Sequence, residues 1–301
     1  MISQLPRRPP TIPKRDVKLQ AGHNVSLKEM LDRLYLENNT NEFIPKDPVQ
    51  FPHMYKNKKD REIAAFLAAT IAWGRRDLIL KSAKKMFALM GKSPYDFVMK
   101  GDFPKTPGPK TPGLKTVSQS GGAKPRGMSI HRTFFESDLF YFCRGFRACY
   151  TKFENLETLF VSAPVYSAER ASAGEGSPKD MWDGISLFRE TMAAANSSYS
   201  KHMSSPEAGS ACKRLHLALR WLVRQEGPVD LGIWKNISPS SLFIPLDLHV
   251  GRAARKLGLL DSGRQANDKK AVISLTEKLR VFCPEDPVKY DLALFGYSVN
   301  E

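Results

Sequence analysis

FFESDLFYFCRGFRACYTKF, residues 134–153, indicates the fold class of this chain. Large apolar residues recur in it every three or four positions, which is typical of a helix face packed on a core: Phe135, Leu139, Phe142, Phe146, Cys149 and Phe153. REIAAFLAATIAWG, residues 61–74, has the same spacing with alanines between the large residues. This second pattern predicts a helix buried on several sides.

The helical periodicity continues along the chain, and no run of alternating residues predicts a strand. The further segments with this pattern are RRDLILKSAKKMFALMG (75–91), CKRLHLALRWLVRQ (212–225), DLHVGRAARKLGLL (247–260), DKKAVISLTEKLRVF (268–282) and DPVKYDLALFGYSV (286–299). We therefore predict an all-α protein with about nine helices.

Proline-rich and polar stretches divide the chain into an arm, a domain and two insertions. Residues 1–22 predict a disordered basic arm, and residues 23–301 a single helical domain. Flexible insertions are predicted at about 103–127 and 161–180. The first insertion carries five basic residues and no acidic one: Lys105, Lys110, Lys115, Lys124 and Arg126.

The composition favours a soluble protein with a polyanionic partner. Lys and Arg number 46 against 31 Asp and Glu, which gives a net charge of +15. No apolar run approaches the roughly 18 to 20 residues that span a bilayer, so no membrane partner is expected. The four cysteines show no CxxC pairing, which favours free thiols in an intracellular, reducing compartment. The basic N-terminus lacks a secretory apolar region but leaves an organellar transit peptide open.

Asp247 occupies the most suggestive position in the sequence. It stands between Pro245 and a helical pattern that begins at Leu248, so we expect it to cap that helix. A capping Asp stabilises a helix by about 1 kcal/mol and commonly does nothing more. At a cleft, however, such a carboxylate is suited to activating water or stabilising a cationic transition state.

Asp247 also lies in a motif that resembles known families. IPLDLHVGRAARKLGL, residues 244–259, resembles a segment of the helix-hairpin-helix DNA glycosylase superfamily, whose aspartate caps a helix and serves in base excision. Longer stretches are similar to the uncharacterised DUF2400 proteins: residues 47–76, 213–224, 229–260 and 286–301. The glycosylase resemblance implies a multi-helix, glycosylase-like architecture with Asp247 as catalytic residue. The similarity to DUF2400 proteins does not indicate any particular activity, because the role of that family is not established.

The chain departs from the glycosylases upstream of the aspartate. They carry a glycine-rich hairpin that grips a DNA phosphate and, in some members, supplies a catalytic lysine. Here EGPVDLGIWKNISPSSLFIP, residues 226–245, has no G-x-G and contains Lys235 as its lysine. The basis for phosphate gripping and for Schiff-base chemistry is therefore missing, unless residues 236–242 form a substitute turn. The cysteines of an iron–sulfur cluster are also absent, and no cofactor is predicted.

Basic residues at helical spacing are candidates for nucleic-acid binding. Lys213, Arg220 and Arg224 are predicted to form one cationic stripe suited to a phosphate backbone. Arg75 and Arg76 are expected at a helix end, where they either complement its C-terminal dipole or contact a second phosphate. Arg252 is expected on the outer face of its helix. For all of these residues, a simply solvated surface is the alternative.

Aromatic and histidine residues are candidates for lining a site. Trp73, Trp221 and Trp234 could stack on a flipped base, with core packing as the alternative. His249 is predicted to pack, form a hydrogen bond or line the site. Metal-ligand spacing is absent around Asp247 and His249, so no metal site is predicted.

Three hypotheses follow. The first is a nucleic-acid-binding protein, with DNA preferred over RNA, that hydrolyses a base N-glycosidic bond using Asp247. The second is a non-catalytic nucleic-acid-binding protein in which Asp247 acts as a cap. The third is a basic scaffold that docks proteins through residues 103–127 and 161–180.

Overall fold

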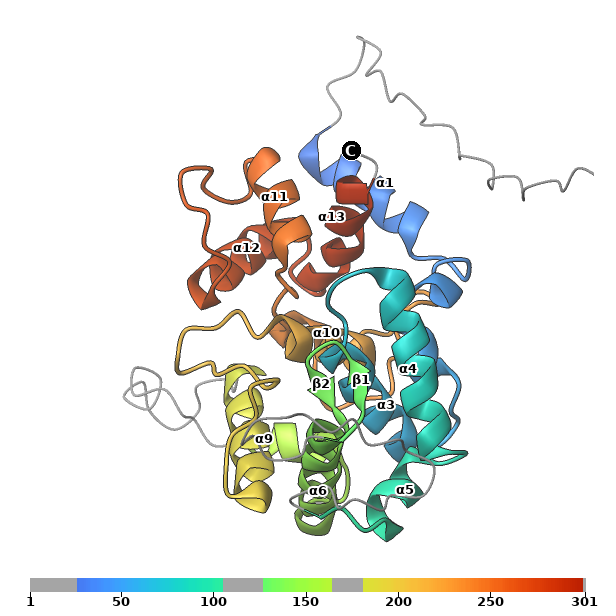
Figure 1. Cartoon of the computed structure of the whole chain (residues 1–301). Coiled ribbons are helices and arrows are strands. Elements are labelled where there is room, and N and C mark those ends of the chain that lie inside the picture. The colour runs from blue at the N-terminus through green and yellow to red at the C-terminus, as the bar shows by residue number, and fades with distance from the viewer. Residues whose placement is uncertain (1–25, 105–126, 164–180, 300–301) are drawn as a thin grey trace, which may run out of the picture.

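The computed structural model describes residues 26–104, 127–163 and 181–299 (Figure 1). The predicted arm and most of both predicted insertions lie outside these residues. The described part is mostly helical, which confirms the all-α class. Its α-helices are α1 (Leu27–Asn38), α2 (Gln50–His53), α3 (Lys58–Thr70), α4 (Arg76–Met90), α5 (Pro94–Lys100), α6 (Glu136–Lys152), α7 (Leu156–Val161), α9 (Met181–Asn196), α10 (Lys213–Val223), α11 (Leu248–Lys256), α12 (Lys269–Phe282) and α13 (Tyr290–Val299).

The described residues contain more elements than the sequence predicted. Twelve α-helices replace the expected nine or so, because short helices such as α2 and α7 have too few residues to show a periodicity. Three 3₁₀ turns join them: Ile44–Lys46, Pro239–Ser241 and Pro287–Lys289. A small antiparallel hairpin, β1 (Ser129–His131) and β2 (Phe134–Phe135), was not predicted.

Helix α3 forms the centre of the molecule. Every position from Glu62 to Thr70 is buried, as its alanine-rich sequence predicts. The small residues let α10 and α2 pack closely against it. The carboxylate of Glu62 is buried there too, and it accepts hydrogen bonds from the Trp234 indole at 2.8 Å, the Tyr150 hydroxyl at 2.9 Å and the backbone N–H of Leu156 at 3.2 Å. One buried acidic side chain therefore links α3 to three other segments.

Helices α6 and α9 pack side by side at one end of the molecule (Figure 1). Gly145 permits their close approach, because a Cβ atom at this position would lie 2.2 Å from the Met192 sulfur. Phe66 of α3 meets Phe188 of α9 with ring centroids 4.7 Å apart. These aromatic contacts join the α6–α9 layer to the central helix.

Helices α1, α11, α12 and α13 gather at the opposite end (Figure 1). Capping residues define where α1 and α12 begin. Ser26 and Glu29 form a reciprocal capping box on α1, and Asp268 accepts from the N–H of Ala271 at the start of α12. Helices α3, α4 and α10 lie between the two ends. No helix in the described ranges has the length and apolar character needed to cross a membrane.

The β1–β2 hairpin is attached to the middle of the molecule by His131. One ring nitrogen of this buried histidine lies 3.0 Å from the Ser82 hydroxyl of α4, and the other lies 3.0 Å from the Trp73 carbonyl oxygen. The next residue, Arg132, has a left-handed backbone with φ of 50°. The hairpin therefore holds a tight turn directly against the α3–α4 connection.

Candidate functional site

A cleft of about 1330 Å³ opens where the C-terminal helices meet the α3–α4 connection. Its walls come from residues 72–79, the start of α10, residues 245–250 and the start of α13, with Arg132 contributed by the hairpin. Ligand pockets usually measure about 300 to 1,000 Å³, so the cleft has room for a nucleoside with flanking groups. Its lining contains both signs of charge.

Asp247 lies in the wall of this cleft and caps α11, as its sequence position predicts. One carboxylate oxygen accepts from the backbone N–H of Val250 at 2.9 Å. The Asp247 carbonyl oxygen accepts from the Asn267 side-chain amide, also at 2.9 Å. The side chain nevertheless stays 34% exposed, so a bound molecule can reach its second oxygen.

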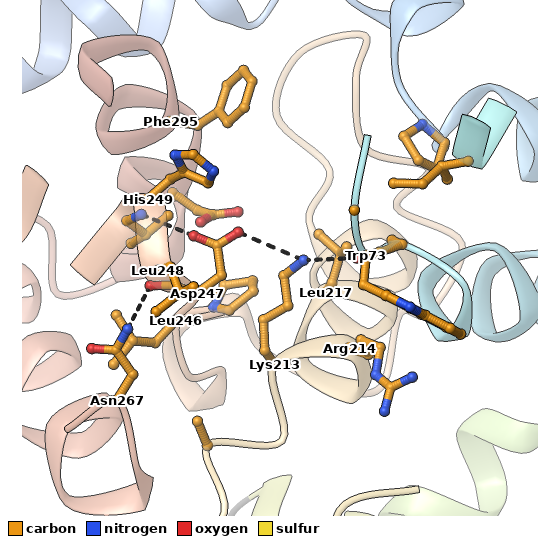
Figure 2. Close-up of a pocket in the computed structure, with 18 of the residues that line it drawn as sticks. Trp73, Lys213, Arg214, Leu217, Leu246, Asp247, Leu248, His249, Asn267 and Phe295 are labelled. Carbon is orange, nitrogen blue, oxygen red and sulfur yellow. Dashed lines mark hydrogen bonds and ion pairs between the residues drawn. The ribbon is translucent and has the colours of Figure 1, made fainter. Parts of the chain in front are cut away.

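Lys213 lies between Asp247 and the opposite wall (Figure 2). Its ammonium group is 3.7 Å from the second Asp247 oxygen and donates to the Ala72 carbonyl oxygen at 3.3 Å. The sequence placed Lys213 among candidate phosphate contacts but gave no sign that it meets Asp247. A lysine at the first position of α10 thus joins the segment that follows α3 to the start of α11.

Arg220 and Arg224 do not form an exposed stripe with Lys213, so that part of the prediction was wrong. Arg220 is 3% exposed and Arg224 is fully buried. The spacing did place both on one face of α10, but that face turns inward toward acidic partners distant in the sequence. Arg220 pairs with Asp230 and Asp291, and Arg224 pairs with Asp230 and Asp286.

The acidic partners keep these two arginines charged. Burial alone would lower the pKa of Arg220, but Asp230 and Asp291 outweigh it and raise that pKa above its usual value. Burial raises the pKa of Asp291 to about 6, against the opposing effect of Arg220 and with a further increase from the charge of Asp247. Asp291 and Asp247 therefore interact electrostatically across the same cleft.

Trp221 and Trp234 are fully buried, so neither can stack on a base. Their alternative, core packing, is confirmed. Trp234 packs on Phe160 with ring centroids 5.3 Å apart and donates to Glu62. Trp73 is different, because it is half-buried and lines the cleft. Its ring stacks on that of His202, with centroids 5.6 Å apart and an angle of 22° between the ring planes.

Arg75 and Arg76 line the cleft at the start of α4, not at the end of α3 as expected. The reason is Gly74, whose φ of 91° turns the chain between the two helices. Arg75 forms an exposed pair with Asp77 at 2.7 Å. Arg76 lies 4.7 Å over the Phe295 ring and 3.8 Å from an Asp47 oxygen. They cannot complement the C-terminal dipole of α3, but they remain candidates for phosphate contact.

His249 is exposed and lines the cleft next to Asp247 (Figure 2). Arg252 lies on the exposed face of α11, as predicted, but outside the cleft lining. Within the described ranges, no three His, Cys, Asp or Glu side chains are grouped so that they could hold a metal ion. Sequence reasoning missed several residues of the cleft lining, among them Arg132, Arg214, Asn267 and Phe295.

Comparison with known proteins identifies the family. A family model described as "Protein of unknown function (DUF2400)" matches residues 47–300. The chain belongs to the DUF2400 family. The matched range contains Asp247, Lys213 and both walls of the cleft, so the cleft is part of the DUF2400 domain. No curated protein and no solved structure matches this DUF2400 chain. The similarity to glycosylases stays a prediction.

Proposed function

We propose that this DUF2400 protein binds a nucleic-acid strand, DNA in preference to RNA, in the cleft and hydrolyses a base N-glycosidic bond with Asp247. The observation that carries the proposal is the Asp247 carboxylate, which stays partly exposed in the wall of a cleft rimmed by arginines and a lysine. The net charge of +15 fits a polyanionic partner. The α11 N-terminus supplies N–H groups that stabilise a carboxylate at this place.

The chemistry needs a carboxylate close to the sugar carbon that carries the base. When the C1′–N bond breaks, its electron pair leaves with the base, and positive charge develops on the sugar ring. The negative charge of Asp247 stabilises this cation. Water then adds its oxygen to C1′, and its proton passes by way of Asp247 to the departing base. Base flipping brings the bond into the cleft, at a cost of a few kcal/mol.

A second candidate is a nucleic-acid-binding protein without catalysis. It is favoured by the contacts of Asp247 itself, since one carboxylate oxygen caps α11 and the other faces Lys213. These two contacts give Asp247 a structural role that explains its position without any catalysis. In this case Lys213, Arg75 and Arg76 would bind phosphates, and no bond would be broken.

Asp247→Asn separates the two candidates, because Asn caps a helix as well as Asp but carries no charge. Wild type and variant are incubated with single-stranded and duplex oligonucleotides that contain normal or damaged bases. Free base and retained complex are scored together. The proposal expects retention by both proteins and base release by wild type alone. Release by the variant at the wild-type rate would remove Asp247 from the mechanism.

A matched control is Asp96→Asn, which removes an exposed carboxylate on α5, away from the cleft. It should release base as wild type does. Salt-sensitive retention by all three proteins without release from any substrate would favour the non-catalytic candidate.

A further inference from the structure

Arg132 and Arg214, on the Trp73 side of the cleft, differ from the other buried or cleft-lining arginines in having no acidic partner among the described residues. Arg75, Arg76, Arg220 and Arg224 each have a carboxylate within 4.0 Å. Among the described residues, neither Arg132 nor Arg214 forms an ion pair, although both line the cleft. Their positive charge is therefore not neutralised within that part of the chain.

Arg214 is half-buried and makes two uncharged contacts. Its guanidinium donates to the Thr70 carbonyl oxygen at 2.8 Å and lies 5.1 Å from the centre of the Trp73 ring. Burial lowers the pKa of this guanidinium. A buried charge without a counter-charge costs free energy, and an anion beside it would recover that cost. Figure 2 shows Arg214 next to Trp73, across Lys213 from Asp247.

Arg132 is held at the cleft by the β1–β2 hairpin. The backbone of this residue has a positive φ, which is uncommon for arginine, and its carbonyl oxygen accepts from the Ser129 hydroxyl at 3.0 Å. Its guanidinium lies so close to Gly74 that a Cβ atom there would be 2.5 Å from Nη1. Since Gly74 follows Trp73 in the chain, Arg132 and Arg214 flank the same short segment.

We infer that Arg132 and Arg214 form a phosphate-binding subsite on the Trp73–Gly74 wall of the cleft. The planar guanidinium fork matches two phosphate oxygens at once, and two such groups on one wall suit a single phosphate. That this phosphate belongs to the strand whose sugar lies at Asp247 rests on the proposed function. The subsite itself rests on the two unpaired guanidinium groups.

The test uses the full chain with Arg132→Asn and Arg214→Gln. Asn tolerates the left-handed backbone at position 132, so the first variant removes charge without adding strain. Arg33→Gln, on the exposed surface of α1, is the matched control. Binding of a short single-stranded oligonucleotide is measured by anisotropy across a salt series. Each cleft variant should reduce the salt slope by about one, and the control should leave it unchanged.

A second measurement uses inorganic phosphate alone, by thermal unfolding at constant ionic strength. Phosphate should raise the Tm of wild type and Arg33→Gln and should not raise that of either cleft variant. Because Arg132→Asn leaves the half-buried Arg214 in place, it tests the subsite even where Arg214→Gln fails to fold.

The outcomes separate the subsite from the proposed function. One outcome is that phosphate raises the Tm of wild type but not of the cleft variants, while wild type binds no oligonucleotide. This outcome supports the subsite and counts against a nucleic-acid strand as the source of the phosphate that it binds. The opposite outcome is that both variants bind the oligonucleotide with an unchanged salt slope and phosphate does not raise the Tm of wild type. This outcome overturns the subsite while the proposed function stands.

Discussion

At the scale of single residues, Asp247 has a structural and a proposed chemical role that substitutions can separate. The cap on α11 uses one oxygen, so Asp247→Ala should lower the free energy of unfolding by about 1 kcal/mol, whereas Asp247→Asn should change it little. Urea unfolding checks both values. Asp268→Ala removes the equivalent cap of α12 and should cost a similar amount. An Asn variant as unstable as the Ala variant would show that the Lys213 pair, rather than the cap, stabilises α11.

His216 is a residue whose burial makes stability depend on pH. It packs on Trp182 with ring centroids 4.4 Å apart, and neither ring nitrogen has a hydrogen-bond partner among the described residues. Burial, with a smaller effect from Lys269, lowers the pKa of His216 to about 3 from 6.5. Below pH 6.5 the unfolded chain binds a proton at His216 that the folded chain does not. The free energy of unfolding therefore has its full value, as far as His216 is concerned, above pH 6.5 and decreases as the pH falls below it.

Replacing His216 with Phe should remove this pH dependence. Between pH 6.5 and pH 5, the free energy of unfolding of the variant should fall less steeply than that of wild type, by up to about 1.4 kcal/mol per pH unit. Trp182→Phe is the control, because it disturbs the same cluster without removing a titrating group. Equal slopes for wild type and His216→Phe between these pH values would contradict the account.

At the scale of elements, α10 is held to the end of the molecule that contains α1 and α13 by charge as well as by packing. Arg224 pairs with Asp230 and with Asp286, and it donates to the Tyr35 hydroxyl of α1 at 3.1 Å. The inward face of α10 thus connects α1 with the segments before α13 and after α10 itself. Removing one member of such a network leaves buried charges unpaired.

Arg224→Leu should therefore destabilise the fold by about 3 to 5 kcal/mol, measured by chemical unfolding. Arg252→Leu, on the exposed face of α11, should change stability by less than about 0.5 kcal/mol. A loss below about 1 kcal/mol for Arg224→Leu would mean that the buried pairs do not contribute as their geometry indicates.

At the scale of the whole molecule, local patterns predicted the helices and the cap. The apolar faces of α3 and α6 follow from residues three or four positions apart, and Asp247 caps α11 because Pro245 prevents an earlier start. These features depend on neighbouring residues in the chain. The sequence therefore predicted the helical class and the capping position of Asp247.

The composition of the cleft could not be predicted in the same way. Lys213 meets Asp247 through the packing of α10 near α11, and Arg132 reaches Gly74 through a hairpin of very short strands. Spacing also shows which residues of α10 share a face but not whether that face meets water or acidic partners. The basic stripe was for this reason assigned to the surface, although Arg220 and Arg224 are buried.

The most direct measurement is single-turnover base release by wild type and Asp247→Asn, with free base identified by mass spectrometry. The account predicts release by wild type and a loss of at least about a hundredfold in the variant, because the carboxylate stabilises charge that develops in the transition state. Equal release by the two proteins, with both folded and both binding the strand, would contradict the central claim that Asp247 performs the chemistry.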